Sequence, residues 1–365
     1  MVESFWRVLD HMLLRTWLRA AILLLTAARA WDTPAEPENL IQLLQEQTAM
    51  TGSDLAGLRA GKAIAKVLPE HEKGEIVVAG AIRISVPLQF FLNAFRNLST
   101  LERGRQALIV HEFSDPPEQS DLQSLALAPE DINAMSRCRP GSCSVKLSAE
   151  MMEQLRQPES ATAAVDQNLT GNLFRSLILH NVAEYLEEGD QAMITYADKR
   201  PPVLASEVYL GLLNEFDWLS NYAPPLYECL QSYLGRPCPD VDGFLYWSTA
   251  KFGLKPVFAV THAMIYKTSR QGQPWVFIAF KQIYADHYFE GSLGVAVLVE
   301  ESAGPGLWGV YINRSRTDSL QGWLAPIKRA IAESKSREAM QTDLTQLKQS
   351  VESQYQTGTP AGRPR

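Results

Sequence analysis

The sequence predicts an α+β fold in which an antiparallel sheet packs against a long C-terminal helix. β-branched and apolar residues form strand-like runs at 75–85 and 106–113. Four further strand-like runs lie in the last third of the chain, and a long segment with helical spacing follows them at 318–351. Between these groups residues 118–250 are mainly helical in pattern, so a helical block is expected to interrupt the sheet.

Helix and strand signals alternate in the first part of the chain. Apolar residues within 40–44 form a helical stripe, and Asp54 can cap a second helix before the strand at 75–85. Pro87 then stands at a favourable first position for an amphipathic helix, which precedes the second strand.

The last third of the chain carries hairpin signals. The expected strands are at 255–267, 275–284, 292–300 and 307–314. Gly272-Gln273 and Gly304-Pro305-Gly306 provide turns between neighbouring strands. The pairing of these strands is therefore predicted to be antiparallel.

Length and composition exclude several classes of protein. The chain has 365 residues, of which 46% are hydrophobic and 21% charged, so it is expected to fold. Its formal net charge of −7 leaves no basic surplus to neutralise phosphates, and we expect no nucleic-acid partner. Only one long apolar run is present, near the N-terminus, which excludes a membrane protein with several spans.

Residues 1–30 are typical of a secretory signal peptide. Basic residues within 15–19 precede the apolar run 20–27, and the small-x-small sequence at 28–30 is a cleavage signal. An uncleaved membrane anchor or an amphipathic first helix is the alternative. The pattern predicts an exported protein, periplasmic if the source is bacterial.

The four cysteines fit an oxidising compartment. Cys138 and Cys143 enclose a Pro-Gly turn, and Cys229 and Cys238 flank Leu-Gly-Arg-Pro, so each pair can close a short loop. We therefore predict two disulfides, one in each pair. Zinc is the alternative, but no histidine lies in either loop and the second pair lacks the usual spacing. No metal site and no cofactor are expected.

Two stretches of the chain resemble a known family. They are GAIRISVPLQFFLNAFRNLSTLE (80–102) and VYINRSRTDSLQGWLAPIKRAIAESKSREAMQTDLTQLKQSV (310–351). Both resemble the START and polyketide-cyclase-like superfamily, in which a curved antiparallel sheet wraps around one long C-terminal helix, the helix-grip fold. The resemblance implies a helix-grip-like sheet here, with a large helical insertion. It also implies a hydrophobic cavity between sheet and helix, which often holds a lipid, sterol or polyketide in that superfamily.

Two other stretches resemble a group of bacterial exported proteins. They read SLALAPEDINAMSRCRPGSCSVKLS and FLYWSTAKFGLKPVFAVTHAMIYK. This resemblance implies export and gives no activity.

The expected domain organisation follows from these signals. It comprises a signal peptide (1–30), N-terminal helices (31–74), a helix-grip-like core (75–117 and 251–351), a helical insertion (118–250) and a disordered tail (352–365).

Small side chains on one strand are candidates to line the implied cavity. Ala259, Thr261 and Ala263 share a strand face, and facing inward they would leave room for a ligand. Close packing against a helix is the alternative.

Larger residues complete the expected ligand-binding set. Arg314 and Arg316 lie at a strand-to-helix junction, where arginines can bind an anionic head group. Lys281 and Trp323 are further candidates. Alternatively, Asp318 caps the following helix and pairs with one of the arginines.

Evidence for catalysis is sparse in the sequence. No Gly-x-Ser-x-Gly, His-Glu-x-x-His, Walker loop or Gly-x-Gly-x-x-Gly motif is present. The catalytic candidates are His262, Tyr284 and His287. Tyr284 and His287 lie at the end of one expected strand, and His262 could lie near them on a neighbouring strand, where a general acid and base can meet. A solvated rim or a structural hydrogen bond is the alternative for these residues.

These observations predict an exported binding protein for a hydrophobic or amphipathic small molecule, with a lipid as the expected class, acting as carrier or sensor. The alternatives are an enzyme acting on a lipid or polyketide-like ligand and a protein-interaction module that uses the helical insertion. Expected contacts are the ligand, a protein partner at the insertion and a transient contact with a membrane.

Overall fold

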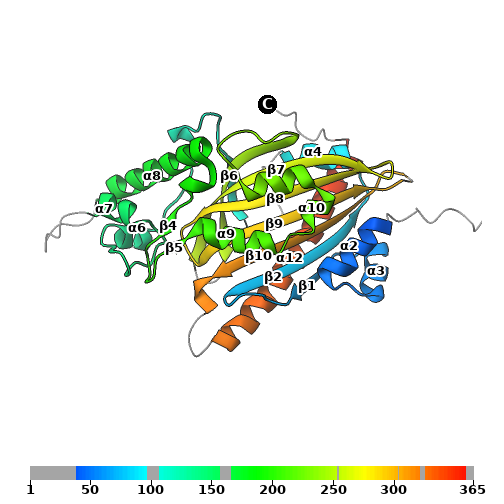
Figure 1. Ribbon diagram of the computed structural model, residues 1–365, viewed down its shortest axis with the longest axis horizontal. Coiled ribbons are helices and arrows are strands. Elements are labelled where there is room, and N and C mark those ends of the chain that lie inside the picture. The colour runs from blue at the N-terminus through cyan, green and yellow to red at the C-terminus, as the bar shows by residue number, and fades with distance from the viewer. Residues whose placement is uncertain are drawn as a thin grey trace, which may run out of the picture.

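An antiparallel sheet organises the molecule (Figure 1). The computed structural model describes residues 38–96, 107–156, 166–252, 255–302, 304–320 and 325–358. The strands of the main sheet are β1 (Ile64–Leu68), β2 (Glu75–Ile84), β3 (Ala107–Glu112), β6 (Val241–Phe252), β7 (Lys255–Arg270), β8 (Gln273–Ala285), β9 (Phe289–Glu300) and β10 (Leu307–Thr317). In the described part of the chain they pair in the order β1-β2-β10-β9-β8-β7-β6-β3, and every neighbouring pair is antiparallel.

Helices flank the sheet and fill the block between β3 and β6. The α-helices are α2 (Glu38–Thr48), α3 (Gly52–Arg59), α4 (Leu88–Arg96), α6 (Pro129–Met135), α7 (Ala149–Leu155), α8 (Gln167–Glu188), α9 (Ala205–Asn214), α10 (Leu219–Tyr222), α11 (Pro224–Gln231) and α12 (Ala325–Gln356). Short 3₁₀ helices are η1 (Gln119–Leu122), η2 (Gly189–Ala192) and η3 (Asp318–Leu320), and β4 (Thr195–Tyr196) pairs with β5 (Val203–Leu204).

The two faces of the sheet carry different layers. Figure 1 shows α12 behind the sheet and α9 and α10 in front of it. Strand alternation separates the two layers along β2: Ile82 and Ile84 pack with α4 and α12, whereas Val77 and Ala79 pack with α2 and α3. The helices of the insertion belong to the same core as Val77 and Ala79.

α12 approaches the sheet closely at Gly80 of β2. A Cβ atom at this position would come within 2.5 Å of Leu344 Cδ1 and 2.9 Å of Met340 Cγ, so a side chain would displace the helix. The Gln341 side-chain amide donates to the Ala63 carbonyl (2.7 Å), and Lys348 Nζ donates to the Arg83 carbonyl (2.6 Å). The closing helix is thus fixed across β1 and β2.

The structure confirms the predicted fold class: an α+β fold with a helix-grip-like antiparallel sheet, a long C-terminal helix and a large helical insertion. The hairpin between β7 and β8 is present with its turn one residue earlier than predicted, because Gln271 and Gly272 both have positive φ angles (51° and 77°), as a type I′ turn requires, and Gln273 begins β8. Both predicted disulfides, Cys138–Cys143 and Cys229–Cys238, are present.

Three of the expected boundaries differ. β6 begins at Val241, inside the range expected to be helical, because Leu245 and Trp247 alternate with outward residues at the period of a strand. β1 lies inside the range expected to hold only N-terminal helices, and it is a five-residue edge strand. α12 continues to Gln356, into the range expected to be disordered. The predicted signal peptide and the residues after 358 lie outside the described residues.

Candidate ligand-binding cavity

A cavity of about 430 Å³ lies between the sheet and α12. Its walls come from β2, the strands β6 to β10, α4 and α12. This volume lies within the range of small-molecule sites, roughly 300–1,000 Å³. The sheet and α12 therefore border a cavity at the position that the helix-grip resemblance implies.

One end of the cavity is apolar. Ile84, Leu298 and Phe91 line it there, together with Phe95 of α4 and Leu344 of α12. α4 supplies its phenylalanines because its apolar residues repeat at helical spacing and face the sheet. The apolar end thus results from two amphipathic helices closing over one strand face.

A row of uncharged polar side chains crosses the other end of the cavity. We call Thr261, Gln282, Ser292, Asn313 and Ser315 the polar row; all five line the cavity. Thr261 pairs with Gln282, and Ser292 pairs with Ser315. The register of β8 on β9 places Gln282 beside Ser292, so the row runs continuously over four strands.

Hydrogen bonds join one half of the polar row. The Asn313 side-chain amide donates to Ser292 Oγ (3.1 Å), and Ser315 Oγ donates to Asn313 Oδ1 (2.8 Å). The two serine hydroxyls are 2.8 Å apart. Thr261 and Gln282 are only 9% and 8% exposed, and their side chains make no hydrogen bond with any residue in the described ranges.

Only part of the predicted ligand-binding set lines this cavity. Thr261 does so, as expected from the small-residue face of its strand. Ala259 and Ala263 flank it on β7 but are not among the lining residues. Trp323 lies outside the described residues.

Lys281 lies on the opposite face of the sheet. Successive residues of a strand face opposite sides, and because Gln282 lines the cavity, Lys281 points toward the insertion. There its fully buried side chain forms an ion pair with the partly exposed Asp190 and lies 3.9 Å from the ring centre of Tyr209. Burial lowers the pKa of Lys281 to about 8, and the charge of Asp190 opposes this effect. The expectation that Lys281 contacts the ligand does not fit this position.

Arg314 and Arg316 also face away from the cavity. They alternate along β10 with Asn313 and Ser315, which face inward. Arg314 Nη1 donates to Glu75 Oε1, and Arg316 Nε donates to a Glu290 carboxylate oxygen, each at 2.7 Å. Both guanidinium groups are thus engaged by carboxylates, and the expected role in binding an anionic head group does not fit the structure.

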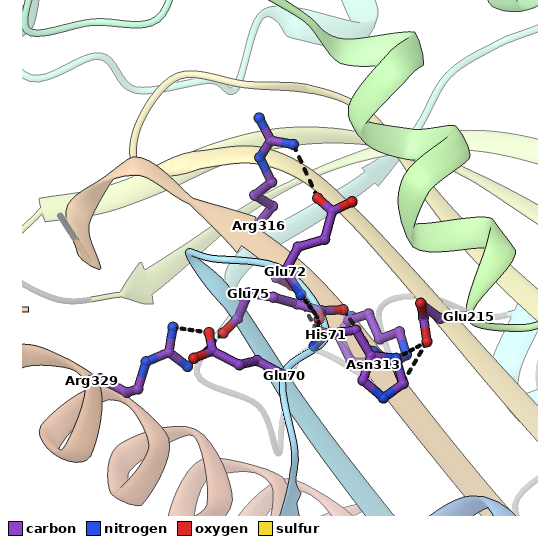
Figure 2. Close-up of polar contacts among 10 residues, drawn as sticks. Glu70, His71, Glu72, Glu75, Glu215, Asn313, Arg316 and Arg329 are labelled. Atoms are coloured by element: carbon purple, nitrogen blue, oxygen red, sulfur yellow. Dashed lines mark hydrogen bonds and ion pairs between the residues drawn. The ribbon is translucent and has the colours of Figure 1, made fainter. Parts of the chain in front are cut away.

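These arginines belong to an ionic cluster around the segment between β1 and β2. Figure 2 shows the carboxylates of this segment facing arginines of β10 and α12. The ion pairs of the cluster are Glu70–Arg329, Glu72–Arg316, Glu75–Arg314 and His71–Glu215. The alternative in which Asp318 pairs with an arginine does not fit either, because Asp318 pairs with Lys146 (3.0 Å) and Lys199 (2.7 Å). The cluster holds the segment against the end of the sheet.

The three catalytic candidates are not brought together. His262 Nδ1 lies 3.0 Å from the Tyr185 hydroxyl, and the Tyr284 hydroxyl donates to the Lys146 carbonyl (2.9 Å). His287 Nε2 lies 3.1 Å from a carboxylate oxygen of Asp131. None of the three lines the cavity.

The pKa values of these candidates reflect their surroundings. Burial, together with the nearby charge of Lys281, lowers the pKa of His262 to about 3. Burial also raises the pKa of Tyr284 well above its usual value. For His287 burial alone would lower the pKa, but the hydrogen bond to Asp131 and nearby carboxylates raise it. His262 is therefore uncharged, and Tyr284 protonated, at neutral pH.

Two further properties concern metals and membranes. In the described ranges no group of three or more His, Cys, Asp or Glu residues is arranged to hold a metal ion. None of the helices that the structure describes combines the length and the apolar character needed to cross a bilayer.

Comparison with known proteins gives little beyond the fold. No protein-family model matches the chain, and no curated protein matches it. The crystal structure of human STARD10 aligns over 90% of this chain and 84% of that chain, at 4% sequence identity and a TM-score of 0.33. A likeness this weak carries no argument about the site, so the helix-grip description rests on the strand order and on the place of α12.

Proposed function

We propose that this protein binds an amphipathic small molecule of the lipid class in the cavity between the sheet and α12, as a carrier or sensor. The observation that carries the proposal is the cavity itself, which is apolar at one end and has a row of uncharged polar side chains toward the other. A molecule with an apolar chain and a polar group matches both ends.

Binding is favoured over catalysis by the placement of the candidate residues. His262 and Tyr284 are buried on the insertion side of the sheet, and His287 is held by Asp131. A general acid or base must come within hydrogen-bond reach of the reacting group. A ligand in the cavity meets the polar row instead.

We also propose that the protein is exported to an oxidising compartment, the periplasm if its source is bacterial. The two disulfides support this proposal, because such bonds persist mainly outside the cytosol. N-terminal sequencing of the secreted protein is the test. A mature chain beginning near Trp31 is the expected result, and an intact N-terminus in the cytosol would contradict it.

A cavity-blocking substitution tests the proposed binding. Ala296 lines the cavity on β9 and is half-buried. The Ala296→Phe variant should fill the space and reduce binding of a fluorescent monoacylglycerol analogue at least ~10-fold, because overpacking excludes the ligand. Ala56→Phe, which adds the same ring at an exposed site on α3, is the matched control.

The outcomes of this titration differ clearly. Saturable binding by the wild type and by Ala56→Phe, with loss in Ala296→Phe, supports the proposal. Equal binding by all three proteins would place the lipid elsewhere and refute the cavity as its site.

A further inference from the structure

We infer that the ligand carries an uncharged polar group with several hydrogen-bonding atoms, such as a glycerol ester, and that this group lies against the polar row. The inference rests on the proposed function and adds the ligand's class and orientation. It excludes free fatty acids, phosphate-bearing lipids and cationic amphiphiles as the preferred ligands.

The first evidence comes from the two residues of the polar row whose side chains have no hydrogen bond in the described ranges, Thr261 and Gln282. Thr261 and Gln282 are more than nine-tenths buried, line the cavity and make no hydrogen bond within the described ranges. Neither residue has a fully buried polar atom that lacks a partner, so the hydroxyl of Thr261 and the amide of Gln282 open on the cavity, where a ligand can reach them. A ligand that supplies a donor and an acceptor would satisfy the Gln282 amide and the Thr261 hydroxyl together.

The other half of the row is arranged as a neutral surface. Ser292, Asn313 and Ser315 already hydrogen-bond one another, so their groups are fixed in place. A serine hydroxyl has two acceptor lone pairs, so a hydroxyl engaged with its neighbours keeps capacity for another contact. The row therefore offers several hydrogen bonds and no compensating charge.

Positive charge is kept off the row. Arg314 and Arg316, the nearest basic residues along β10, face the opposite side and pair with carboxylates. Lys251 is the basic residue among those that line the cavity, and it is exposed. Lys251 pairs with Pro256 of β7. Pro256 precedes Thr261 by five residues, a separation of roughly 16 Å along the strand. An anionic group at the row would be buried without a counter-ion.

The charged residue that α12 contributes to the cavity is acidic. Asp343 lines the cavity, and a carboxylate cannot act as counter-ion for a bound carboxylate or phosphate. The remaining charged alternative is a cationic amphiphile. Because the side chains of the polar row are uncharged, they favour a ligand with a neutral polar group over a cationic one.

The apolar end sets the direction of the chain. Ser315 pairs with Ile76 at one end of β2, whereas Leu307 pairs with Ile84 at the other. The polar row thus lies at one end of the strands, and Ile84, Leu298 and Phe91 lie toward the opposite end. The ligand's chain runs from the row toward α4.

Four probes with the same alkyl chain test the ligand class. They are monolaurin, laurate, dodecane and dodecyltrimethylammonium, each incubated with purified full-length protein below its aggregation concentration. Bound probe is then quantified by mass spectrometry after gel filtration. We expect monolaurin to bind at least ~10-fold tighter than each of the others, because a site built to hydrogen-bond rejects analogues that lack the matching groups.

A paired set of variants tests the orientation. The Gln282→Leu/Thr261→Val double variant keeps the approximate shapes but removes the unpaired polar groups. It should weaken monolaurin ~10-fold or more and leave dodecane unchanged or tighter. Leu298→Ala at the apolar end is the control and should weaken monolaurin and dodecane alike.

Each result separates the inference from the proposed function. Tightest binding of laurate, dodecane or dodecyltrimethylammonium overturns the inference while cavity binding stands. An equal loss of monolaurin and dodecane in the double variant also overturns it. Failure of every probe, and of the fluorescent analogue, to bind the wild type refutes both.

Discussion

His262 of β7 faces the aromatic side chains of the insertion, where burial controls its charge. Its Nδ1 is 3.0 Å from the Tyr185 hydroxyl, and its ring packs edge-on against Tyr233. Because burial lowers the pKa of His262 to about 3, the folded protein keeps it neutral well below its ordinary value of 6.5. The unfolded chain has no such restriction.

This difference predicts a pH dependence of stability. Below pH 6.5 the unfolded chain binds a proton that the folded chain does not, so stability is lost as pH falls from 6.5 toward 3. The contribution lost by about pH 5 is about 2 kcal/mol. His262→Gln keeps an uncharged hydrogen-bonding group and should lack this part of the acid sensitivity.

Urea unfolding of both proteins near pH 7 and near pH 5 provides the measurement. The stability advantage of the wild type over His262→Gln should shrink on acidification. An advantage that stays constant would show that His262 titrates normally in the folded state.

The sequence identifies which residues each strand contains, but not which face of the sheet each side chain lies on. The small residues around Thr261 identify it as a candidate to line the cavity. Gln282 is not identified, and its neighbour Lys281 is selected instead because of its charge. Their sides are set by the register of β7 on β8, which shifts between Val260 and Thr261. A single-residue shift of register reverses every side chain beyond it, and tertiary pairing decides where it occurs.

α12 is the element on which the cavity depends. It crosses β2 at Gly80, where the absence of a side chain lets Met340 and Leu344 reach the strand. Ser336, Ala339 and Leu347 of the same helix line the cavity beside this contact. The same helix thus makes the close contact at Gly80 and forms one wall of the cavity beside it.

Replacing Gly80 tests this arrangement. The Gly80→Val side chain would overlap Leu344 and Met340, so the helix should shift and stability should fall by about 1–3 kcal/mol. Gly52→Ala is the matched control, because a Cβ there meets nothing within 4 Å. Denaturant unfolding of the two variants gives the comparison, and equal stabilities would argue against close packing of α12 on β2.

The sequence predicts the elements unevenly. The long C-terminal helix and the β7–β8 hairpin are predicted because their periodicity and turn residues are local signals. β6 is not, because it follows a helical block and its aromatic residues fit a helix as well as a strand over a short window. β1 is not predicted, because it is an edge strand of five residues with Lys66 at its centre and its sequence shows little apolar alternation.

The sheet has a different partner on each face of the molecule. The insertion and the N-terminal helices form a continuous core with one face, and α4 and α12 enclose the cavity on the other. The ion pair between the fully buried Lys281 and the partly exposed Asp190 links the sheet to the insertion. The largest buried core therefore lies on one face of the sheet and the cavity on the other.

Breaking this ion pair should affect the whole molecule. Asp190→Asn leaves the buried Lys281 ammonium without its counter-ion and should cost about 3–5 kcal/mol. The double variant Asp190→Asn/Lys281→Met removes both charges and should recover much of that loss. Calorimetry of the single and double variants makes the comparison, and a small effect of Asp190→Asn would show that the pair does not couple the insertion to the sheet.

The measurement that tests the account most directly is the organic extract of the protein itself. The full chain is exported in its natural compartment, purified without detergent, extracted and analysed by mass spectrometry. We expect a near-stoichiometric neutral amphiphile in the wild-type extract and its absence from the extract of Ala296→Phe. An empty wild-type extract that stays empty after incubation with total lipid would contradict ligand binding in the cavity.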